Sequence, residues 1–111
     1  MGDYKKALQH YETALKIYTI IGDNLRMAYC HSGLGLTNES IGEHKESLEH
    51  YNQAIEKRKK MKDMVGIARE YYNISFVFSN TGKNKGLWNL LQMLNRFLKN
   101  LKGVMATVIL S

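Results

Sequence analysis

Apolar side chains recur along most of the chain at intervals of three and four residues, which is the period of an amphipathic helix. Between Asn24 and Ile41, apolar or small residues keep this spacing and show no strand-like alternation. Between Glu43 and Met61, one helical stripe is formed by Leu48, Tyr51, Ala54 and Ile55. The chain contains no proline, so its composition permits long uninterrupted helices. The pattern therefore predicts an all-α fold.

The chain also repeats itself after forty residues. The opening MGDYKKALQHYETALKI matches IGEHKESLEHYNQAIEK at residues 41–57, and the identical pairs include Gly2/Gly42, Leu8/Leu48, His10/His50, Tyr11/Tyr51 and Ala14/Ala54. A fixed period of this size indicates stacked supersecondary units, and the short turns make consecutive helices antiparallel neighbours. We therefore expect the second helix of a partial repeat at 1–21, a full repeat at 22–61 and the first helix of a third repeat at 62–82.

Several positions of the full repeat follow a known order, which is small residue, Leu-Gly, Gly, small residue, aromatic and Ala. These positions are Ala28, Leu34-Gly35, Gly42, Ser47, Tyr51 and Ala54. The order resembles the tetratricopeptide repeat, and the spacing resembles the extended class of kinesin light chain, Pins-type polarity adaptors and bacterial sensor and regulator proteins. Over residues 1–82 the resemblance implies an α-α superhelix, a solenoid of antiparallel helix pairs with about two and a half repeats. It also implies a non-catalytic module that binds a protein or peptide segment in a concave groove.

In that family the first helix of each repeat lines the groove. The corresponding positions here are Tyr29, Ser32, Leu36, Glu39, Ser40, Arg69, Tyr72, Phe76, Ser79 and Asn80. Tyr72 and Phe76 stand one helical turn apart and would form an aromatic patch, while Arg69 could bind a carboxylate. The alternative is that a following helix covers Tyr72 and Phe76 as part of the core.

The net charge of +6 is placed unevenly along the chain. Residues 81–111 carry five basic and no acidic side chains, whereas the repeat body is nearly neutral. Within that body, a basic patch is predicted at Lys57, Arg58, Lys59, Lys60 and Lys62. It either stabilises a helix end on a solvated face or contacts phosphate or an acidic peptide. No aromatic residues interleave with it, which argues against nucleic acid as the partner.

The residue types that carry chemistry do not form a recognisable catalytic or metal motif. His10 and His50 occupy the same repeat position and are expected to be part of the packing framework. His31 and His44 have no partner at metal-ligand spacing, and Cys30 has no readable base beside it. We therefore expect no metal, no cofactor, no catalytic residue and no enzymatic activity.

The last part of the chain departs from the repeat. Residues 83–102 predict a divergent amphipathic helix with a wide apolar face, and the apolar tail at 103–111 is left unassigned. That helix could instead drive self-association into a homo-oligomer, and the mid-repeat start would suit a fragment of the sensor array of a larger signalling protein. A single cysteine and the lack of a signal peptide or membrane span predict a cytoplasmic location.

Overall fold

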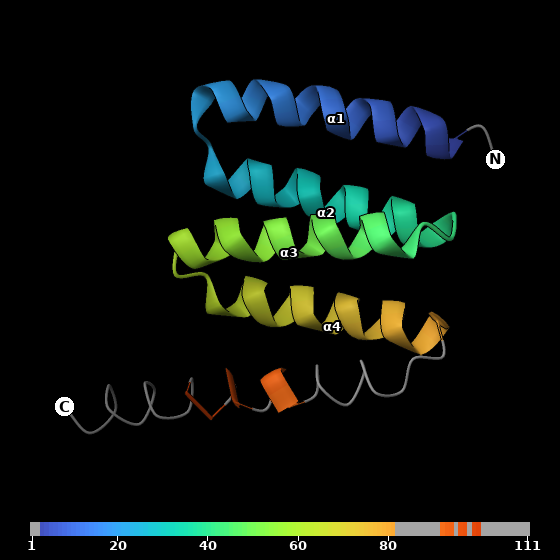
Figure 1. Ribbon diagram of the computed structural model, residues 1–111. Coiled ribbons are helices and arrows are strands. Elements are labelled where there is room, and N and C mark those ends of the chain that lie inside the picture. Colours follow the sequence, from blue (N-terminus) through green and yellow to red (C-terminus); the bar gives the residue numbers. More distant parts are fainter. Residues whose placement is uncertain (1–2, 82–91, 95, 98, 101–111) are drawn as a thin grey trace.

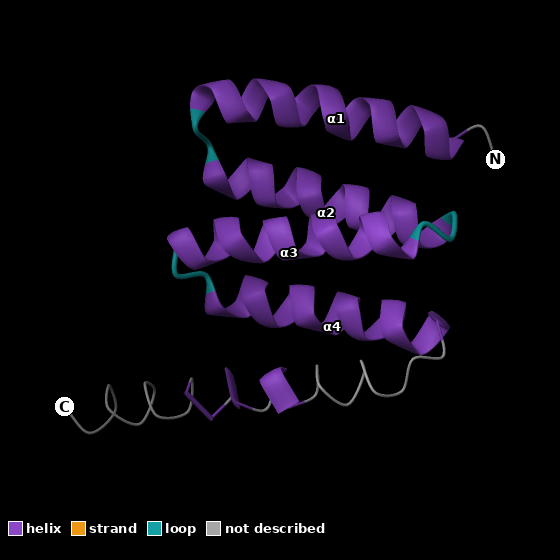
Figure 2. Cartoon of the chain, viewed as in Figure 1, coloured by secondary structure: helices purple, strands orange, loops and turns teal. Residues whose placement is uncertain are grey.

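The computed structural model describes residues 3–81, 92–94, 96–97 and 99–100. Four helices follow one another in a single row, each antiparallel to the one before it (Figure 1): α1 (Asp3–Ile21), α2 (Asn24–Ser40), α3 (His44–Lys60) and α4 (Met64–Thr81). The described part of the chain consists of helices and short turns (Figure 2). The predicted all-α fold of antiparallel helix pairs is confirmed, and the predicted bounds of α2 and α3 differ from the observed ones by one residue.

The three turns between these helices share one backbone geometry. Gly22, Gly42 and Lys62 all have positive φ, at 80°, 85° and 57°. The residue after each of them donates its amide to a carbonyl five residues earlier, for example Glu43 to Asn38 at 2.8 Å. This left-handed ending suits glycine, as the sequence predicted for Gly42. Because the turn recurs every twenty residues, the helices have similar lengths and stack in register.

The packing of α2 against α3 rests on a close approach at Gly35. A Cβ atom on Gly35 would lie 2.6 Å from Cε1 of Tyr51, so only glycine leaves room for the ring. Ser47 donates its hydroxyl to the Gly35 carbonyl at 2.8 Å. Tyr51, Ser47 and Ala54 are completely buried. The small residues of the repeat pattern therefore bring the helices together, and the tyrosine fills the space between them.

A second core lies between α3 and α4. Its buried members are Tyr51, Ile55, Ile67, Ile74 and Val77, with Leu48, Tyr71, Phe78 and Phe97 packed against them. The rings of Tyr71 and Phe97 lie 6.3 Å apart, so the helical residues around Phe97 cover this side of α4. Most of the predicted terminal helix at 83–102 and the whole tail at 103–111 lie outside the described residues. The division into repeats at 1–21, 22–61 and 62–82 stays a prediction.

The row of helices has two different sides. The backbone of α2 approaches those of α1, α3 and α4, whereas the backbones of α1 and α3 do not come this close within the described helices. Helices two apart thus approach each other on the α2/α4 side, so the row curves toward that side. We call the exposed side chains of α2 and α4 on this side the inner face; they include Tyr29, Leu36, Tyr72 and Phe76.

We predict that Gly35→Ala destabilises the protein. The added methyl group overlaps the ring of Tyr51, and overpacking of this kind costs about 1–3 kcal/mol of unfolding free energy, although alanine favours the helix. Urea denaturation followed by circular dichroism measures the change. The neighbouring Leu36→Ala variant is the control, because Leu36 is half exposed and its removal should change stability little. Equal stability of wild type and Gly35→Ala would contradict the packing described for Tyr51.

Candidate functional site

The inner face carries large apolar side chains that remain in solvent. The exposed fractions are 56% for Tyr29, 50% for Leu36, 59% for Tyr72 and 46% for Phe76. The rings of Tyr72 and Phe76 meet edge to face at 4.9 Å, and Arg69 is exposed one turn earlier on α4. Phe97 packs against the ring of Tyr71, while Tyr72 and Phe76 remain exposed.

Other residues predicted for the groove hold α2 to α4. Ser32 donates its hydroxyl to Oε1 of Glu70 at 2.8 Å. Asn80 donates its amide to Oε1 of Glu39 at 3.1 Å, and Tyr51 donates its hydroxyl to the other oxygen of Glu39 at 3.2 Å. These hydrogen bonds fix the spacing of the two inner helices. Ser79 and Ser40 are exposed, and the Ser40 hydroxyl donates to the Leu36 carbonyl.

The predicted basic patch is divided between the surface and the interior. Lys59, Lys60 and Lys62 are exposed and Lys57 is half-buried, but Arg58 is only 3% exposed. We therefore correct the prediction that Arg58 belongs to the basic patch, because its side chain is buried. It follows Tyr51 and Ala54 on the stripe of α3 that faces α4, so the helical period turns it inward.

Inside the fold, Arg58 lies among two carboxylates and one aromatic ring. Its Nη1 donates to Oδ2 of Asp63 at 2.8 Å, and its Nε lies 3.8 Å from Oε1 of Glu70. Its guanidinium carbon is 5.6 Å from the centre of the Tyr29 ring. A side chain at Gly66 would collide with Asp63 and Arg58, so this glycine makes room for the pair. The cluster therefore joins α2, α3 and α4 directly behind the inner face.

The pKa values of the two carboxyl groups in this cluster are shifted in opposite directions. The backbone amide of Gly66, donating to Oδ1 of Asp63 at 2.9 Å, lowers the pKa of Asp63, and Arg58 adds to this effect. Burial raises the pKa of Glu70, while the Ser32 hydrogen bond and the charge of Arg58 oppose that rise. Glu70 is completely buried, and its Oε2 has no hydrogen-bond partner in the described part of the protein.

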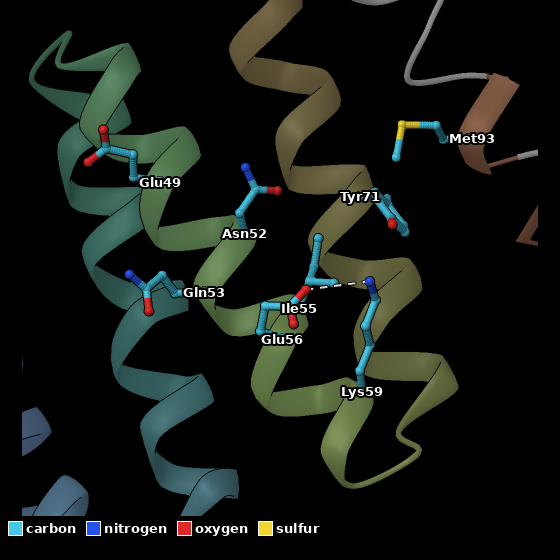
Figure 3. A pocket seen from close by; sticks show the side chains of 8 residues that line it. All are labelled: Glu49, Asn52, Gln53, Ile55, Glu56, Lys59, Tyr71 and Met93. Atoms are coloured by element: carbon cyan, nitrogen blue, oxygen red, sulfur yellow. Dashed lines mark hydrogen bonds and ion pairs between the residues drawn. The ribbon is translucent and has the colours of Figure 1, made fainter.

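A cavity of about 450 Å³ lies beside α3. Tyr71 and Met93 stand at one end of it, and Lys59 is paired with Glu56 at 3.5 Å (Figure 3). The lining consists of Glu49, Asn52, Gln53, Ile55, Glu56, Lys59, Tyr71 and Met93. It offers carboxylate, amide and ammonium groups but brings together no nucleophile with a histidine base.

The structure also brings together two histidines that lie far apart in the sequence. Nδ1 of His31 on α2 lies 3.1 Å from Nδ1 of His50 on α3. Spacing along the chain hides this pair, because nineteen residues separate its members. The antiparallel register of α2 and α3 around Gly42 was the signal that could have revealed it. Among residues 3–81 and the later helical positions described, no group of three or more His, Cys, Asp or Glu residues is arranged to hold a metal ion.

Comparison with known proteins gives a family match over the first part of the chain. The family model described as tetratricopeptide repeat matches residues 1–60, which is more than half of the sequence. The matched region contains α1, α2 and α3, and so the Gly35–Tyr51 contact. No curated protein matches the chain. In the described part of the chain, the helices are too short or too polar to span a membrane.

We predict that Arg58→Ala strongly destabilises the fold. The substitution leaves Glu70 buried without its cation, and breaking a buried ion pair from one side costs about 3–5 kcal/mol. The adjacent Lys59→Ala variant is the matched control, since its exposed pair with Glu56 is worth less than about 1 kcal/mol. Chemical denaturation of both variants measures the difference. Similar losses for the two variants would show that Arg58 behaves as an ordinary surface residue.

The raised pKa of Glu70 predicts a specific pH dependence. A carboxyl group with a higher pKa in the folded than in the unfolded chain favours folding at low pH, and this contribution is lost as the pH rises through the folded pKa. From about pH 4.5 toward 7, the wild type should therefore lose stability relative to Glu70→Gln, whose amide oxygen can still accept from Ser32. Denaturation series at several pH values test this difference, with the exposed Glu56→Gln as control. Parallel profiles for wild type and Glu70→Gln would contradict it.

Proposed function

The chain belongs to the tetratricopeptide repeat family, and from this premise we propose that its inner face binds a peptide segment or a helix of a partner protein. Repeats of this family generally mediate protein-protein interaction and are typically non-catalytic. The side chains that contribute most to binding in this proposal are Tyr29, Leu36, Tyr72 and Phe76, together with Arg69.

The observation that carries the proposal is the exposure of these four apolar side chains on two neighbouring helices. Each is close to half exposed or more, although other large apolar side chains of α2 and α4 are buried in the core. Aromatic side chains in such positions commonly dominate binding energy, because they bury a large area with few rotatable bonds. A partner that covers Tyr72 and Phe76 would remove both rings from water in one step.

Charge gives the proposed site a direction. Arg69 is exposed on the first half of α4, and the basic patch residues Lys60 and Lys62 lie at the turn that precedes this helix. At the other end of the face, both oxygens of Glu39 already accept hydrogen bonds. The partner would therefore place an acidic group toward Arg69, where a guanidinium can bind a carboxylate with two parallel hydrogen bonds.

The interior supports this face mechanically. Arg58 lies behind the ring of Tyr29, and the Ser32–Glu70 and Asn80–Glu39 hydrogen bonds fix α4 against α2. A surface whose helices are already held in place loses little conformational freedom on binding. This favours a partner segment that orders itself on a preformed surface.

We predict that Tyr72→Ala and Phe76→Ala each weaken binding at least about tenfold, which corresponds to about 1.4 kcal/mol. Peptides selected against the full chain by display would be titrated with wild type and variants by isothermal calorimetry. Ile20→Ala is the matched control, because Ile20 is 87% exposed on α1, outside the inner face. Circular dichroism should show that both inner-face variants keep their helix content. Unchanged affinity in both, or melting of both, would contradict the proposal.

A further inference from the structure

The structure assigns a second site to the pair His31–His50, and we propose that it binds a borderline divalent transition-metal ion such as Zn²⁺ through the two Nδ1 atoms. The rings come from opposite helices of the full repeat, with centroids 5.4 Å apart and planes inclined by 30°. Since Nδ1 faces Nδ1 at 3.1 Å, only one proton fits between them, so one ring donates and the other accepts. The site is separate from the inner face and from the family role of the chain.

The separation of the two nitrogens suits a metal ion. Two nitrogen ligands of a tetrahedral zinc ion, each about 2.0–2.1 Å from the metal, lie about 3.3 Å apart. The pair therefore has nearly the required spacing, and each ring would turn so that its lone pair points at the ion instead of at the facing nitrogen. The Nδ1 proton of the donor ring moves to its own Nε2 through solvent, so both rings stay neutral and the ion gains two ligands.

The chemistry of the two ring nitrogens suits a metal ion of this class. Imidazole nitrogen is a preferred ligand of Zn²⁺, Cu²⁺ and Ni²⁺.

Charges of both signs surround the pair. The exposed carboxylates Glu12 on α1 and Glu49 on α3 act on His50, and the cation Lys57 acts on His31. His50 is only half-buried, so solvent can reach the pair and provide the remaining ligands. With two protein nitrogens, the site is expected to bind less tightly than a structural zinc site with four protein ligands. Its effect would be to link α2 to α3 within one repeat.

The repeat provides an internal control for this site. His10 occupies the same repeat position as His50, but it is exposed on α1 and lies beside Tyr11. Forty residues after His31 stands Tyr71, so the third repeat lacks the other partner. The pair therefore occurs in the full repeat, and His10→Gln changes a histidine of the same repeat position without touching the site.

The test is a titration of the full chain with zinc chloride, with magnesium chloride as the comparison salt. Wild type should bind one Zn²⁺ per chain by calorimetry, and saturation should raise Tm by about 5 °C. His50→Gln should lower the zinc affinity at least tenfold, whereas His10→Gln should match wild type. No Tm rise in wild type, an undiminished response in His50→Gln, or an equal loss in His10→Gln would overturn the proposal.

A second measurement keeps the proposal testable if His50→Gln fails to fold. Imidazole ¹⁵N spectra of the wild-type chain report which ring nitrogens bind zinc. The Nδ1 signals of His31 and His50 should shift together during the titration and saturate at the same zinc concentration. Shifts confined to the exposed His10 or to His44 would overturn the assignment.

Discussion

Gly35 lies directly beneath the ring of Tyr51, and this contact sets the distance between α2 and α3. The hydroxyl of Ser47 reaches the Gly35 carbonyl only because the two backbones are this close. The same approach places the Tyr51 hydroxyl against Glu39. A larger residue at position 35 would separate the helices along their length. These polar contacts therefore depend on the close packing of the Tyr51 ring on Gly35.

Hydrogen bonds connect this contact to α4. Glu39, held by Tyr51, accepts from Asn80 and so positions α4 against α2. At the opposite end of the helices, Arg58 and Glu70 require each other in a buried environment. Such a pair adds little net stability, because both groups lose their hydration. It does penalise any other register of α4 against α3, since a shift would leave one charge buried alone. The aromatic side chains of the inner face thereby acquire fixed positions.

The sequence predicted the parts of this structure that repeat every forty residues. The helices and the turn at Gly42 followed from residues forty positions apart that share one packing role. The run of basic residues at 57–60 predicts a surface patch, but the side chain of Arg58 lies on the buried stripe of Tyr51 and Ala54. The His31–His50 pair could not be predicted from spacing, because its members become neighbours only when α2 and α3 fold against each other. The exposure of Tyr72 and Phe76 could likewise not be predicted from the sequence, because the position of Phe97 beside Tyr71 is known only from the structure.

The repeat also separates residues that build the scaffold from residues that are free to differ. Ala28 and Ala68 are equivalent, as are Tyr11 and Tyr51, and these positions pack one helix on the next. On the inner face the equivalent pairs differ, with Tyr29 against Arg69, Ser32 against Tyr72 and Leu36 against Phe76. Identical helices at these positions would present a uniform surface to any partner. Because the pairs differ, the α4 half of the face is the more aromatic and carries a positive charge, so the proposed site would favour one direction of a bound segment.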